Sequence, residues 1–183
     1  MIHPLADVQT TQIGPHTSVW QFSVILRGAR IGHHCNINCH TFIENNVTLG
    51  NYVTVKAGVY LWDGLEAEDY VFIGPNVTFT NDKRPRSKHY PKSFQSTLIK
   101  HHASIGAAAT ILGGLTIGEY AIVGAASVVT KEVPARSLVV GQPARIVGWV
   151  NEDGTPMEEI AEAMYLDKAG HRWQVEKQRI YQI

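Results

Sequence analysis

The chain of 183 residues has few features that would tie it to a membrane, a nucleic acid or an oxidising compartment. Its only two cysteines, Cys35 and Cys39, give no disulfide framework, so we expect a cytoplasmic protein. No apolar run approaches the roughly 18 residues of a membrane-spanning helix, and the N-terminus lacks the pattern of a signal peptide. Sixteen Lys and Arg balance sixteen Asp and Glu, so no global field attracts nucleic acid or a membrane surface.

The sequence does contain a six-residue repeat. Aliphatic residues recur at every sixth position from Ile13 to Phe79 and again, out of phase, from Ile99 to Val129. Glycine often follows directly, and a small or β-branched residue follows four positions later. This period matches neither an α-helix, at about 3.6, nor a strand, at about 2, and is typical of a parallel β-helix. The alternative, a sandwich of short strands, requires regularly spaced turn signals and alternating apolar patterns, and neither is present.

We therefore predict an all-β chain wound into a triangular prism with three short strands per turn. The aliphatic row points inward and stacks on its counterparts one full turn away, so each turn buries its apolar side chains against the next. Small residues such as glycine are expected to relieve the backbone at the corners between faces.

A polar segment interrupts the repeat between Phe79 and Ile99, and we predict an extruded loop over residues 80–98. Long loops on a rigid scaffold tend to be functional. The loop carries one acid, Asp82, and several cations: Lys83, Arg84, Arg86, Lys88 and Lys92. Such a local cationic patch is suited to phosphate, and the alternative is an ordinary solvated loop.

Residues one full turn apart are expected to form columns on one corner of the prism. Three columns bring polar side chains towards the base of the loop: Glu44, Trp62 and Thr80; Asn45, Asp63 and Asn81; and, on the neighbouring face, His40, Gly58 and Asn76. Gly58 is expected to leave space beside His40. These columns are the best candidate active site, and the alternative of an inert surface His40 stays open.

The spacing of His33, His34, Cys35, Cys39 and His40 resembles that of zinc ligands. Cys35, however, takes the small position near the core, and Cys39 and His40 lie beyond a corner. Because these side chains diverge, we expect no metal site.

The last repeats resemble a known superfamily. Gly-Ala-Ala-Ser-Val-Val-Thr-Lys (124–131) followed by Val-Val-Gly-Gln-Pro-Ala-Arg (139–145) is similar to the terminal signature of acyl-CoA-dependent hexapeptide transferases. That resemblance implies a left-handed β-helix, a homotrimer, and an acetyl-CoA arm that runs along this coil between two subunits. The residues it assigns to the coenzyme are Gly113, Ala125, Ala126, Lys131 and Arg145, the last two near the adenine and 3′-phosphate.

Three further segments, 38–47, 56–64 and 71–87, resemble the dTDP-3-amino-3,6-dideoxyhexose N-acetyltransferases, and the likeness extends over residues 1–150. It implies transfer of an acetyl group from acetyl-CoA to the 3-amino group of the sugar, in nucleotide-sugar synthesis for surface glycans such as lipopolysaccharide O-antigen. Catalysis is then assigned to Asn81, which would hold the sugar amine, and to His40 as the candidate proton acceptor. The expected substrate-binding residues are Glu44, Trp62, Asp63, Asp82, Lys83, Arg84 and Arg86, with Arg86 as the diphosphate candidate.

Other functions remain open at this point. A UDP-2-acetamido-3-amino-uronate N-acetyltransferase shares the architecture, as do non-catalytic β-helix proteins. A zinc lyase of the γ-carbonic-anhydrase type needs histidines that converge from two subunits, whereas His101 and His102 are adjacent and should diverge.

Residues 151–183 follow the repeats and are predicted to form a C-terminal cap. Thr155-Pro-Met-Glu158 has the pattern of a capping box, which predicts a short helix through Met164. Trp173, Val175, Ile180 and Tyr181 predict a hairpin that covers the open end of the prism.

Overall fold

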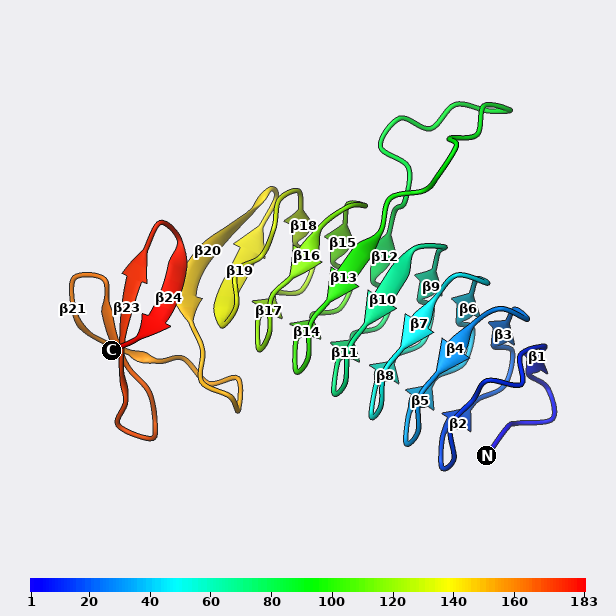
Figure 1. Cartoon of the computed structure of the whole chain (residues 1–183), viewed down its shortest axis with the longest axis horizontal. Coiled ribbons are helices and arrows are strands. Elements are labelled where there is room, and N and C mark those ends of the chain that lie inside the picture. Colours follow the sequence, from blue (N-terminus) through cyan, green and yellow to red (C-terminus); the bar gives the residue numbers. More distant parts are fainter.

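The computed structural model describes residues 1–183 and forms a parallel β-helix with three flat faces (Figure 1). The chain contains strands and no helix, so no helix is available to cross a membrane. Face 1 consists of β2 (Ser18–Val19), β5 (Asn36–Ile37), β8 (Thr54–Val55), β11 (Phe72–Ile73), β14 (Ser104–Ile105), β17 (Ile122–Val123), β19 (Ser137–Gly141) and β20 (Ala144–Trp149). Face 2 consists of β1 (Asp7–Val8), β3 (Val24–Ile25), β6 (Phe42–Ile43), β9 (Tyr60–Leu61), β12 (Thr78–Phe79), β15 (Thr110–Ile111) and β18 (Val128–Val129). Face 3 consists of β4 (Arg30–Ile31), β7 (Thr48–Leu49), β10 (Leu65–Ala67), β13 (Thr97–Ile99) and β16 (Thr116–Ile117).

The strands pair in the predicted register, in which each strand lies beside its equivalent one turn later. Phe42 lies opposite Tyr60 and Ile43 opposite Leu61, and all ladders within the prism are parallel except that between β19 and β20. Beyond Ile13, which is half-buried, the inward row is buried, with Ile43, Leu61 and Ile105 at 0% exposure. This burial confirms the predicted core. Because each such side chain contributes about 1.5–3 kcal/mol when buried, the stacked rows hold the prism together.

The glycines that follow the inward row serve a different purpose from the one predicted. None of them has a positive φ; the left-handed corner positions are mostly occupied by other residues, such as His40 (φ 56°) and Ala126 (φ 56°). A Cβ on Gly106 would lie 2.6 Å from the backbone nitrogen of Ala125 in the next coil. These glycines are therefore required because neighbouring coils approach closely, not because the corner turns.

The corner between faces 3 and 1 carries a ladder of aromatic rings that runs the length of the prism. Successive rings stack with centroids 4.7–4.9 Å apart, and Arg136 follows 4.6 Å above the last ring. The members of this aromatic ladder are His16, His34, Tyr52, Tyr70, His102, Tyr120 and Arg136. Desolvation and the neighbouring His16 and His33 lower the pKa of His34, which favours the neutral form of that imidazole.

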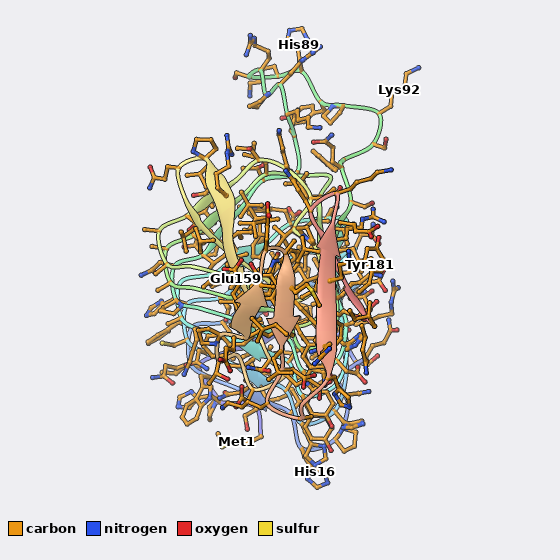
Figure 2. The ribbon with its side chains drawn as sticks, turned by 90° about the vertical axis from the view of Figure 1, so that its left-hand side faces the viewer. Met1, His16, His89, Lys92, Glu159 and Tyr181 are labelled. Atoms are coloured by element: carbon orange, nitrogen blue, oxygen red, sulfur yellow. The ribbon has the colours of Figure 1, made fainter.

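The chain leaves the prism between β12 and β13, at the corner between faces 2 and 3. Residues 80–96 form the loop, which projects well away from the coils (Figure 1). The predicted loop is confirmed, except that β13 begins at Thr97 and so takes the last part of the predicted range. In Figure 2 the loop, with His89 and Lys92, lies on the side of the molecule opposite His16.

The tail forms a four-stranded antiparallel sheet instead of a helix and a hairpin. Its strands are β21 (Glu158–Ala161), β22 (Met164–Leu166), β23 (Arg172–Glu176) and β24 (Arg179–Gln182). The predicted helix is wrong: residues 158–161 pair with β22, and the Thr155 hydroxyl oxygen accepts from the side-chain amide of Asn151 at 3.2 Å instead of from a helix N–H. The predicted hairpin is confirmed as β23 and β24, and Figure 2 shows the sheet lying across the end of the prism.

Candidate functional site

The corner between faces 2 and 3 gathers the polar columns at the base of the loop. One carboxylate oxygen of Glu44 accepts a hydrogen bond from the backbone N–H of Asp63 at 2.6 Å. Asp63 in turn accepts from the N–H of Asn46 at 2.7 Å, and its carbonyl accepts from the side-chain amide of Asn81 at 3.3 Å. The predicted columns are thus linked across three coils, and the Asn81 amide oxygen remains without a partner in the chain.

Trp62 is fixed beneath this corner. Its indole N–H donates to the carbonyl of Phe79 at 2.9 Å, and its ring lies 5.8 Å from that of Phe42. Tyr60, 51% exposed, completes the cluster at 6.0 Å from Trp62. Trp62 therefore belongs to an aromatic patch on face 2, and its edge borders the polar corner.

Gln95 and Gly113 close the base of the loop, and the role of Gln95 escaped the sequence analysis. The backbone N–H of Gln95 donates to the carbonyl of Asn81 at 3.0 Å, which joins the two ends of the loop. Gly113 donates to the Thr80 hydroxyl at 3.0 Å. The side-chain oxygen of Gln95 is buried without a partner beside this junction. Only its position near the end of the loop could have pointed to Gln95, because there the chain returns to the corner beside Gly64 of the preceding coil.

Gly113, which is predicted to bind the coenzyme, packs within one chain against the base of the loop. It lies beneath Thr80 and Asn81, on a different corner from Ala125 and Ala126. A Cβ at Gly113 would approach the Thr80 carbonyl oxygen to 2.6 Å and the Cα of Asn81 to 3.0 Å. The absence of a side chain at Gly113 therefore lets the backbone of Asn81 lie close to the next coil.

Two of the loop's cations border a hollow of about 620 Å³. Asp82, Arg84 and Arg86 line it, together with His89 and Tyr90, which the sequence analysis had not selected. Asp82 accepts from the N–H of Arg84 at 2.8 Å, while neither arginine forms an ion pair. Lys83 is exposed on the loop and lies outside the lining. The free guanidinium groups give this hollow the chemistry of a phosphate site.

His40 lies at the corner between faces 1 and 2, and so at the opposite edge of face 2 from Asn81. Crossing the face takes about six residues, which separates the two edges by roughly 15–20 Å. The His40 ring stacks on Phe22 with centroids 5.1 Å apart. The space expected beside His40 is filled, because a Cβ on Gly58 would collide with the side-chain oxygen of Asn76. Within one chain, the two predicted catalytic residues do not meet.

Towards the C-terminal end, the His40 corner becomes a strip of small exposed side chains. Ala108 and Ala126 follow Asn76 in the same column, and Gln142 donates to the Ala126 carbonyl at 2.7 Å where the strip ends. Exposed backbone with little side-chain bulk suits a long, thin ligand laid along the coils. Of the predicted coenzyme residues, Ala125 and Ala126 lie on this strip.

Lys131 and Arg145 are brought together at the end of the prism. Both line a cleft of about 420 Å³ between the last coil and the C-terminal sheet. Neither forms an ion pair. The chain has no group of three or more His, Cys, Asp or Glu arranged to hold a metal ion.

Known structures share this fold. A hexapeptide-repeat acetyltransferase of Vibrio cholerae, solved with acetyl coenzyme A, has 24% sequence identity and a TM-score of 0.56 over 78% of this chain and 74% of its own. A point mutant of AntD, an N-acyltransferase of Bacillus cereus solved with dTDP and coenzyme A, has 20% identity and a TM-score of 0.52 over 83% of this chain and 82% of its own. The architecture is thus the left-handed β-helix of the hexapeptide-repeat acetyltransferases.

Sequence similarity is more specific. The chain is 57% identical over 149 residues to the dTDP-3-amino-3,6-dideoxy-alpha-D-galactopyranose 3-N-acetyltransferase of Aneurinibacillus thermoaerophilus, across 81% of this chain and 78% of that protein. It is 31% identical over 163 residues to the bifunctional protein GlmU of Streptomyces coelicolor, which covers 86% of this chain and only 32% of GlmU. No protein-family model matches the chain. At 57% identity, this chain belongs to the family of nucleotide-linked amino-sugar N-acetyltransferases that the Aneurinibacillus protein represents.

The packing of Gly113 against Asn81 predicts that Gly113→Ala disturbs the loop base. The added methyl group must push the backbone of Thr80 and Asn81, at a cost of about 1–3 kcal/mol. We expect the melting temperature to fall by roughly 3–10 °C and proteolysis of the 80–96 loop to accelerate. Gly148→Ala is the control, because its Cβ would meet nothing within 4 Å. Equal melting temperatures for the two variants would contradict this account.

Proposed function

We propose that this chain transfers the acetyl group of acetyl-CoA to the 3-amino group of a dTDP-3-amino-3,6-dideoxyhexose. The observation that carries the proposal is the 57% identity to an enzyme named for this reaction on the galactose form of the sugar. The AntD structure solved with dTDP and coenzyme A is consistent with the same pair of ligands. The cationic hollow of the loop supports a nucleoside diphosphate, and the alanine strip supports the coenzyme arm.

We further propose a homotrimer with face 2 turned towards the three-fold axis. The outward positions of face 2 include many apolar side chains beside Asp7, Thr78 and Thr110, whereas those of face 3 carry Arg30, Glu66 and Lys100. The apolar residues that would be covered are Val24, Leu26, Phe42, Tyr60, Trp62, Leu112 and Val128. A surface of this kind on a soluble chain marks a contact site.

The trimer also solves the separation of His40 from Asn81. Around a three-fold axis the contacts are heterologous. The corner between faces 1 and 2 of each copy therefore meets the corner between faces 2 and 3 of the next copy. The corner with His40 and the alanine strip of one subunit then lies against the corner with Asn81 and the loop of its neighbour. Three complete sites form at the three subunit boundaries.

The reaction joins the sugar nitrogen to the acetyl carbon and breaks the carbon–sulfur bond of the thioester. The amine must arrive unprotonated, and the amide oxygen of Asn81, whose N–H donates to the Asp63 carbonyl, would accept a hydrogen bond from one of its N–H groups. As the tetrahedral intermediate collapses, the amine proton passes to His40 or directly to the departing thiolate. Because a thiolate leaves readily, positioning supplies most of the acceleration.

The carboxylates of Glu44 and Asp63 each use one oxygen for the backbone of the corner. Their second oxygens would accept hydrogen bonds from sugar hydroxyl groups. Arg86, assisted by Arg84 or Lys83, would hold the diphosphate, with Asp82 beside it. Trp62 would border the sugar or base. We assign the enzyme to the cytoplasm and its product to a surface glycan such as an O-antigen, because both proposed substrates are activated biosynthetic intermediates.

The acidity of the corner predicts a preference among acceptor sugars. Glu44, Asp63 and Asp82 suit hydroxyl groups and an ammonium group but repel the extra carboxylate of a uronate. We expect kcat/KM to be higher for dTDP-3-amino-3,6-dideoxyglucose or its galactose epimer than for a UDP-2-acetamido-3-amino-uronate. The measurement is thiol release from acetyl-CoA with each sugar. Faster turnover of the uronate would contradict the proposal and favour the alternative function of a UDP-2-acetamido-3-amino-uronate N-acetyltransferase.

The division of the site between copies predicts complementation between two inactive variants. Asn81→Ala should lower kcat by about 10²-fold. Ala126→Trp should block the coenzyme strip without breaking the corner, because the same left-handed column already carries Phe22 and His40. Co-expressed at equal levels, the two variants should regain about one quarter of wild-type activity, since each site takes its two edges from different copies.

Light scattering supplies the control for that experiment and should give the mass of a trimer for every sample. No recovery in trimers shown to be mixed would place both edges of a site in one chain, and a monomer would rule out the shared site.

Replacing His40 tests the route of the proton. We expect His40→Ala to lower kcat by about tenfold or less, because the thiolate itself can accept the proton. His40→Phe retains a ring against Phe22 and should match His40→Ala in kcat while preserving the melting temperature. A loss beyond about 10³-fold in both variants would instead make His40 an obligatory base.

A further inference from the structure

The cleft at the end of the prism lies between the last coil and the C-terminal hairpin. The last coil supplies the floor, where Val133 and Trp149 are each 4% exposed. The opposite wall is the β23–β24 hairpin, which contributes Val175 and Gln178. Lys131 and Arg145 are on the rim. The cleft therefore combines an apolar floor with unpaired positive charge, in a volume of about 420 Å³.

The hairpin is held firmly over the coil. The guanidinium group of Arg136 lies 4.6 Å from the ring centre of Tyr120 and 4.8 Å from that of Trp173, which joins the aromatic ladder to β23. Arg136 also pairs with Glu152 at 2.8 Å, and its side chain is only 12% exposed. Sandwiched and paired in this way, Arg136 fixes the height of the hairpin above the cleft.

The turn of the hairpin is built with residues that do not favour it. Both central residues, Lys177 and Gln178, have positive φ, 46° and 62°, in a two-residue turn where Asn-Gly or Asp-Gly is preferred. Such strain persists where the surrounding structure needs particular side chains. Glu132, the one acid of the cleft, accepts a hydrogen bond from the N–H of Thr116 at 2.7 Å, on the face 3 side.

We propose that the C-terminal hairpin completes the binding site for the nucleotide end of acetyl-CoA, with Gln178 as a specificity residue of the coenzyme. The proposal rests on the function proposed above. The adenine would enter between Trp149 and Val175, and its ring edge or ribose would meet the Gln178 amide. The 3′-phosphate would lie at Lys131 and Arg145, which no carboxylate neutralises. The hairpin then distinguishes acetyl-CoA from thioesters that lack a nucleotide.

The test is calorimetric titration with adenosine 3′,5′-bisphosphate, which carries the nucleotide end of the coenzyme alone. We expect wild-type protein to bind it and Gln178→Glu to weaken binding by about tenfold, since the amide is lost and a negative charge is added. Gln174→Glu is the matched control; it adds the same charge on the same hairpin, on the strand position that faces away from Val175, and should leave binding unchanged. Circular dichroism of both variants verifies the fold.

Kinetics separate this proposal from the proposed function. Gln178→Glu should raise the KM for acetyl-CoA by about tenfold, leave kcat near wild type, and leave turnover of S-acetylpantetheine unchanged. Wild-type binding of the bisphosphate by Gln178→Glu, or equal weakening by Gln174→Glu, would overturn the role of the hairpin. If no amino sugar is acetylated but the binding difference is observed, the acceptor assignment fails and the coenzyme site stands.

Discussion

The whole molecule depends on the close contact between successive coils. Each inward side chain, such as Ile43 or Ile105, stacks on its counterparts one coil away, so a slip in the register between coils would break these contacts. The same contact explains the glycines, because a Cβ at Gly106 would strike the next coil. A rigid register between coils also fixes the positions of the corner side chains relative to one another. The proposed site is a set of corner residues held by that constraint.

This rigidity determines what could be predicted from the sequence. The inward rows, the loop and the polar columns follow from a strict period, and the contacts among Glu44, Asp63 and Asn81 agree with it. The period gives positions along each corner, but it does not tell how far apart two corners are. For that reason His40 was grouped with Asn81 although a whole face separates them. The predicted coenzyme residues Gly113 and Ala125 likewise lie on different corners of one chain.

Where the repeat ends, local signals become weak. The Thr155–Glu158 segment satisfies a helix-capping pattern, but the side-chain amide of Asn151 donates to both the Thr155 hydroxyl oxygen and the carbonyl of Pro156. A short helix gains little without tertiary packing, whereas a strand gains a partner in β22. The role of Gln95 was hidden for another reason: its effect comes through the backbone, which a side-chain pattern does not reveal.

The aromatic ladder restricts where this architecture can acquire new segments. From His16 to Arg136 its rings stack without a gap, so an insertion at that corner would separate two rings and lose both contacts. The corner of the alanine strip tolerates little bulk if it carries a coenzyme. Only the corner at Asn81 is left free to lengthen. Variation in acceptor sugar among relatives of this chain should therefore accumulate along a single edge of the prism, while the other two edges stay nearly constant in length.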